Sequence, residues 1–202
     1  MNEKHGDILL KVDSAQHEHK VDSVELWEMA SFAKEWFEDA KRESKTGKDV
    51  GARRREVLFS VCCVESYLLE WVRDEVLNQD LKGVTRYFPP GQKKGISEKW
   101  KEIPKKLRAD GLITAVPNHG TKIFGDFKNL VAIRDGIVHA RSSRPASAKM
   151  PNHEKPFPTL SDLQTMKPGW ALGVVVKLLE DLHETLKTSK PLWLEYSKET
   201  VP

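Results

Sequence analysis

The 202 residues include 33 Lys and Arg against 30 Asp and Glu, which gives a net charge of +3 with neutral His. A hydrophobic fraction of 39% and a charged fraction of 31% are typical of a soluble globular chain with one domain. The longest apolar run, Trp170 to Val176, is far shorter than the ~18–20 residues of a membrane helix. The first residues carry acids and lack the apolar stretch of a secretion signal. We therefore expect a cytoplasmic protein without a membrane span.

Two adjacent cysteines, Cys62 and Cys63, are the only ones in the chain. They exclude a disulfide framework and a four-cysteine zinc site, so buried, reduced thiols are expected. The run His17-Glu18-His19 lacks further metal ligands, and no glycine loop of a nucleotide site occurs. We predict no metal and no cofactor. A surplus of three positive charges does not by itself indicate nucleic acid.

Apolar residues recur at three- and four-residue steps through most of the chain, a spacing that predicts helices. The second of these helices is the longest, and its wide apolar stripe indicates burial against more than one neighbour, as in a central helix. Proline at position 104 predicts a kink or a late start in the third. No alternation of strands and helices is present, so the fold class is all-α, a bundle of four to five helices. The predicted helices are 23–44, 50–78, 97–109, 121–140 and 169–187.

Three segments lie outside this helical pattern. Residues 1–21 are polar and predict an N-terminal arm or a short strand, followed by the helical domain at 22–190. Residues 141–158 hold four of the eleven prolines, which predicts an exposed loop before the last helix. Residues 191–202 predict a tail with two aromatic anchors, Trp193 and Tyr196.

Three polar residues, Arg134, Asp135 and His139, interrupt an otherwise apolar helical pattern. Asp135 and His139 are four residues apart and share a helix face, so the carboxylate can orient the imidazole and raise its pKa. Arg134 lies 100° further round and offers a planar, permanently charged fork. Such a trio suits RNA cleavage without a metal: the histidine takes the ribose 2′-hydroxyl proton, and the arginine stabilises charge on the phosphoryl oxygens. A 2′,3′-cyclic phosphate is the expected product.

The stretch Arg134-Asp135-Gly-Ile-Val-His139 resembles the motif of the HEPN superfamily, in which four to six residues separate Arg and His. The resemblance implies a helical bundle that forms a homodimer, with two motifs in one composite active site. It also implies a metal-independent endoribonuclease of toxin–antitoxin or phage-defence systems, with RNA as substrate and an antitoxin or regulatory protein as a further partner. His139 is then the general base or acid, Arg134 the phosphate clamp and Asp135 the residue that orients His139.

Further candidates lie on the central helix and after the motif. The resemblance places Glu65 or Ser66 near the motif, to support His139 or to contact substrate; the alternative is a polar helix face. Arg141 and Arg144, with Lys149, follow His139 and suit contacts with neighbouring phosphates, or form a solvated basic loop.

A non-catalytic helical interaction or nucleotide-binding module is the alternative function. There Arg134 and Asp135 form a structural ion pair and His139 is a hydrogen-bonded core residue. An unrelated helical bundle is a third interpretation. An exposed His139 that faces a second copy favours the enzyme, and a buried, paired His139 favours the module.

Overall fold

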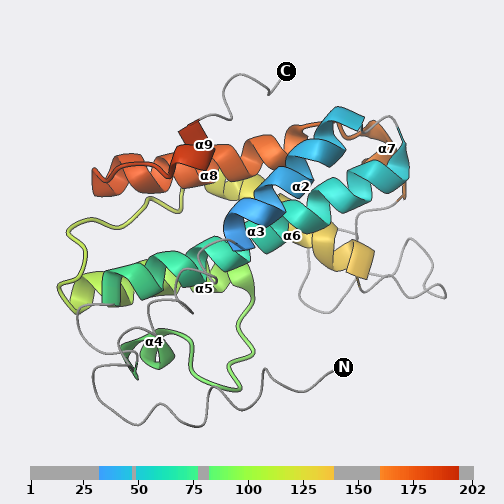
Figure 1. Cartoon of the computed structure of the whole chain (residues 1–202). Coiled ribbons are helices and arrows are strands. Elements are labelled where there is room, and N and C mark those ends of the chain that lie inside the picture. The colour runs from blue at the N-terminus through green and yellow to red at the C-terminus, as the bar shows by residue number, and fades with distance from the viewer. Residues whose placement is uncertain (1–31, 47–48, 77–81, 139–159, 196–202) are drawn as a thin grey trace, which may run out of the picture.

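The computed structural model describes residues 32–46, 49–76, 82–138 and 160–195. All regular secondary structure in this described part is helical and none of it is strand, which confirms the all-α prediction (Figure 1). Five helices have 14 residues or more and match the five predicted ones. They are α2 (Phe32–Thr46), α3 (Val50–Val76), α5 (Ile96–Ala109), α6 (Lys122–Val138) and α8 (Trp170–Leu186).

Three short helices were not predicted: α4 (Lys82–Tyr87), α7 (Leu160–Thr165) and α9 (Leu192–Glu195). Helices this short show too little periodicity to be seen in sequence and depend on tertiary contacts. For α7 the contact comes from Arg53 of α3, whose Nη1 donates to the carbonyl of Leu163 at 3.1 Å and also to that of Gln164. The end of α7 is thereby fixed to the central helix.

The longest helix, α3, is central as predicted. It packs against α2, α4, α6, α7 and α8, and Figure 1 shows α2 lying along it. At about 1.5 Å per residue its 27 residues span about 40 Å, enough to contact partners at both ends. The predicted apolar stripe is buried at every position. Its members are Val57, Val61, Val64, Leu68, Val72 and Val76.

A buried carboxylate on α3 caps the start of α8. Glu56 is completely enclosed, and its Oε1 accepts the backbone N–H groups of Ala171 at 3.0 Å and Leu172 at 3.2 Å. Its Oε2 accepts the N–H of Gly169 at 3.1 Å. These donors have no partner within their own helix, and the positive end of the helix dipole favours an anion there. Burial raises the pKa of Glu56, while the three N–H groups oppose that shift.

Two more buried polar residues of α3 hold α2 and α8. Glu70 Oε1 accepts the N–H of Ala33 at 3.0 Å, and burial raises the pKa of Glu70 to about 7. Tyr67 Oη is hydrogen-bonded to His183 Nε2 of α8, and His183 Nδ1 is hydrogen-bonded to Thr188 at 2.8 Å. Burial also lowers the pKa of His183. The polar residues of α3 therefore tie the bundle together.

Helix α9 packs back over α2, the first described helix. The centroid of the Trp193 ring lies 4.9 Å from that of Phe37 and 6.0 Å from that of Tyr67. Trp193 is therefore an aromatic anchor, as predicted. Tyr196, the arm at 1–21, the first part of the helix predicted at 23–44 and the loop at 141–158 lie outside the described residues.

The two cysteines are free, as predicted. Cys63 is completely buried and Cys62 half-buried, and burial raises the pKa of both thiols. Among the described helices, none has the length and apolar character to cross a membrane.

Candidate functional site

Arg134 lies on the side of α6 that faces α3. Its Nη2 donates to Glu65 Oε1 of α3 at 3.2 Å, and its Nε lies 3.0 Å from Asp135 Oδ1. The Arg134 side chain is 24% exposed, against 41% for Glu65 and 45% for Asp135. The guanidinium therefore sits at the surface end of the α3–α6 contact, with one carboxylate from each helix beside it.

The structure brings together three of the predicted site residues, Arg134, Asp135 and Glu65. Asp135 contacts Arg134, whereas sequence reasoning gave it the role of orienting His139. His139 lies outside the described residues, as do Arg141, Arg144 and Lys149, so their positions stay predictions. Ser66 is half-buried on α3, next to Glu65 in the chain.

The charges of this cluster decide what it can bind. One cation and two anions are present, so a phosphate at Arg134 takes the place of a carboxylate. A guanidinium has five N–H donors in a fixed plane. The Nε–H has no acceptor in hydrogen-bonding geometry, so its contact with Asp135 is electrostatic. Among the residues that the structure describes, Glu65 accepts one hydrogen bond from this guanidinium, through Nη2. The unpaired Nε–H is itself buried, so an oxyanion could reach only the terminal Nη1 and Nη2 groups of Arg134.

Cys62 lies close enough to Glu65 and Arg134 for their charges to change the pKa of its thiol. Burial and the Glu65 carboxylate raise the pKa of this thiol, and Arg134 partly opposes them. The thiolate is the nucleophilic form of cysteine, so a thiol with a raised pKa is a poor nucleophile. The arrangement argues against cysteine chemistry here.

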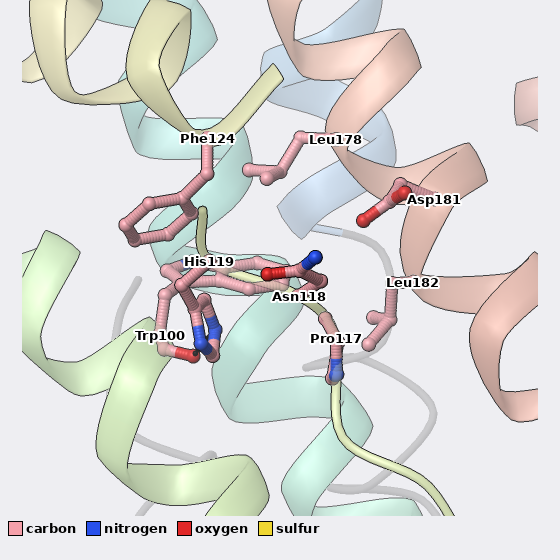
Figure 2. Close-up of a pocket in the computed structure, with 8 residues that line it drawn as sticks. All are labelled: Trp100, Pro117, Asn118, His119, Phe124, Leu178, Asp181 and Leu182. Carbon is pink, nitrogen blue, oxygen red and sulfur yellow. Dashed lines mark hydrogen bonds between the residues drawn. The ribbon is translucent and has the colours of Figure 1, made fainter. Parts of the chain in front are cut away.

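A second group of polar residues lines a small cavity between α5, α6, α8 and the segment 117–121. Figure 2 shows His119, Asn118 and Asp181 around it, with the Trp100 and Phe124 rings. The cavity measures about 10 Å³, which is close to the minimum for one water molecule. It is too small for a substrate.

His119 in this cavity has a structural explanation. Pro104 lies inside α5 and has no N–H, so the carbonyl of Trp100, four residues earlier, lacks its usual partner. His119 Nε2 lies 3.0 Å from that carbonyl oxygen, and burial lowers the His119 pKa, which keeps the ring neutral. A neutral ring with Nε2–H donates this bond. The helix begins at Ile96 despite Pro104, so the predicted late start is wrong.

The arginine run at 53–55 divides as its helical spacing requires. Arg53 binds the end of α7, Arg55 pairs with Glu43 at 2.9 Å, and Arg54 is exposed. Of the described residues, no group of three or more His, Cys, Asp or Glu is arranged to hold a metal. The segment His17-Glu18-His19 lies outside them.

One feature of the charge distribution was missed at the level of sequence. Residues 82–128 contain eleven Lys and Arg but only four Asp and Glu, a surplus of seven in a chain whose net charge is +3. A count of charge along the chain, in place of the total, reveals it. Much of this charge lies on α5 and the adjoining part of α6.

Comparison of the chain with protein-family models, curated proteins and solved structures finds no match.

Proposed function

We propose that the protein is a metal-independent endoribonuclease of HEPN type, with Arg134 as its phosphate clamp. The observation that carries the proposal is the position of Arg134, which is half-buried at the α3–α6 contact and held between the Glu65 and Asp135 carboxylates. Two carboxylates fix the guanidinium before substrate arrives. A preorganised donor set of this kind stabilises charge that develops on phosphoryl oxygens.

The proposed reaction starts with the 2′-hydroxyl of a ribose. His139 takes its proton, the 2′-oxygen bonds to the adjacent phosphorus, and the bond from phosphorus to the 5′-oxygen breaks. A proton from the second histidine of a homodimer goes to the leaving 5′-oxygen. Arg134 stabilises the negative charge on the phosphoryl oxygens during this step. When substrate binds, Asp135 leaves Arg134 and forms a hydrogen bond with His139 instead. The products are a 2′,3′-cyclic phosphate and a 5′-hydroxyl.

The biological setting follows from the same resemblance. A helical domain with this motif fits a toxin–antitoxin or phage-defence system, in which an antitoxin or regulatory protein restrains the ribonuclease. Arg141 and Arg144 would then contact phosphates that flank the cleaved bond.

Cleavage of labelled RNA in excess chelator tests the proposal. We expect wild type to produce cyclic-phosphate ends, Arg134→Ala to lose about a thousandfold in rate, and His139→Ala to lose more. Arg54→Ala is the matched control, because Arg54 is an exposed arginine on α3. If wild type is a folded dimer and cleaves no RNA, structured or unstructured, the proposal is wrong.

A non-catalytic interaction module is the second candidate. The hydrogen bond from Arg134 to Glu65 joins α6 to α3, which is what a structural ion pair does. In that case Arg134→Ala lowers stability and leaves no activity to lose. Measuring unfolding and cleavage on the same variants separates the two functions.

A further inference from the structure

The exposed surface of α5 carries a row of cations. Lys101, Lys105 and Arg108 are spaced at i, i+4 and i+7, so they share one helix face. The row extends over seven residue steps, or about 10 Å of helix. The row borders the buried side of α5, which consists of Ile96, Trp100, Ile103, Pro104 and Leu107, and Lys101 at this border is half-buried.

Most of the nearby acids are already paired with other cations. Glu102 pairs with Lys94, Asp110 with Arg86 at 2.6 Å and Asp126 with Lys122 at 2.6 Å. Lys105, Arg108 and Lys128 are exposed and have no ion-pair partner within the part of the chain that the structure describes. Their charge is therefore available to an external anion.

The row continues onto α6. Lys101 Nζ lies 5.5 Å from the centre of the Phe124 ring, which joins the α5 face to the start of α6. Lys128 and Asp135 follow Phe124 at i+4 and i+11 and share its side of α6. Ten residues of helix, about 15 Å, separate Phe124 from Arg134. Lys128 is the cation of this face nearest to Arg134, six residues or about 9 Å earlier along α6 and about 120° round the helix from it.

We propose that this basic face, formed by Lys101, Lys105 and Arg108 of α5 with Lys128 of α6, binds the phosphate backbone of single-stranded RNA and directs it to Arg134. The choice of RNA rests on the proposed function. Lys and Arg contacts to phosphates supply affinity and register without sequence readout. A linear row of cations suits a chain of evenly spaced phosphates.

A membrane surface fits this face less well. Helices that bind membranes present large apolar side chains beside their basic residues. The large hydrophobic residues that are exposed in the described part of the chain are Phe32, Val138 and Leu192, and none of them is on α5. The α5 face therefore offers charge without the apolar anchor that a bilayer requires.

Fluorescence anisotropy with a labelled, 2′-O-methylated single-stranded RNA tests the proposal, because such RNA binds but has no 2′-hydroxyl to react. The test variant is Lys105→Glu with Arg108→Glu. Its control is Arg54→Glu with Lys177→Glu, which makes the same change in net charge at exposed positions of α3 and α8. We expect the test variant to bind about tenfold more weakly near 0.1 M salt. The slope of log K against log salt falls by about 1.4, that is 0.7 per lost phosphate contact.

Equal weakening in both double variants overturns the proposal, since binding then follows net charge. Wild-type binding to anionic vesicles or to a poly-glutamate peptide, but not to RNA, overturns it as well. The proposed function fails separately. RNA binding that depends on Lys105 and Arg108, without cleavage of unmodified RNA, supports the basic face and rejects the ribonuclease. Cleavage of unmodified RNA that is equally fast in the Lys105→Glu, Arg108→Glu variant supports the ribonuclease and rejects the basic face.

Discussion

Glu56 and Arg134 both place a charge where two helices meet, but in different surroundings. Glu56 is completely enclosed, and backbone N–H groups of α8 occupy both its oxygens. Arg134 is 24% exposed, and its partners are carboxylates that are themselves about half exposed. Backbone partners cannot leave without unfolding the helix, whereas side-chain partners can rotate away. The first arrangement defines the fold, and the second permits a ligand to replace a partner.

The comparison of Glu56 with Arg134 predicts the largest loss of stability for Glu56→Gln. The amide keeps the shape but brings an N–H₂ group to the N–H of Gly169, and it removes the charge that faces the start of α8. We expect a loss of about 3 kcal/mol in the free energy of unfolding. Denaturant titration measures it, with Glu98→Gln on exposed α5 surface as the control.

A second prediction concerns pH and Glu70. Burial is the main cause that raises the pKa of Glu70 to about 7 in the folded state. Between the unfolded pKa of about 4.5 and pH 7, the folded protein therefore holds a proton on Glu70 that the unfolded chain has lost. Stability from this group is full below about pH 4.5 and declines as pH rises to about 7. Between pH 5 and pH 8 we expect wild type to lose about 2 kcal/mol more than Glu70→Gln does, which keeps an acceptor for Ala33. Parallel pH–stability curves for the two proteins would contradict this prediction.

Tyr67→Phe tests the effect of losing a buried hydrogen bond between two uncharged groups. The change removes the hydroxyl hydrogen-bonded to His183 Nε2 and leaves that nitrogen unpaired in the core. We expect a loss of about 1–2 kcal/mol, smaller than for Glu56 because no charge is involved. Thermal unfolding measures it, and Thr188→Val, at the other ring nitrogen of His183, should cost less because Thr188 is exposed.

The smallest change in stability is expected for Arg134→Gln. Exposed and half-exposed ion pairs contribute about 0–1 kcal/mol, so the variant should unfold within about 1 kcal/mol of wild type. A loss as large as that of Glu56→Gln would break the comparison. Arg134 would then be a structural residue, and the interaction module would become the better explanation.

Much of the fold could be predicted because it depends on apolar spacing. The stripe from Val57 to Val76 repeats for five turns, and this repeat alone locates α3 and its central place. The same holds for Trp100, Ile103 and Leu107 of α5, whose three- and four-residue spacing predicts an inward face and which are all buried. Periodicity reports burial, and burial decides where long helices pack.

The polar contacts of the core could not be predicted in this way. Glu56 and Glu70 look in sequence like members of a solvated helix face, because their partners lie far along the chain. The bond between His119 and the Trp100 carbonyl follows from a missing N–H at Pro104, but only the fold brings His119 there. At the candidate site, spacing along one helix gave Arg134 and Asp135, and only the packing of α3 on α6 showed that Glu65 binds Arg134.

The long reach of the α3 contacts also governs how the chain folds during synthesis. Glu56 meets its partner 113 residues later, and Tyr67 meets His183 116 residues later. The α2–α3 hairpin is synthesised before α8, and its two helices contact each other over a short sequence distance. Glu56 and Tyr67 of α3 nevertheless have no partners until α8 has been synthesised. Such distant contacts slow folding and leave apolar surface open in the meantime. The nascent chain can therefore complete its core only after α8 has left the ribosome, and the contact of Trp193 with Phe37 forms later still.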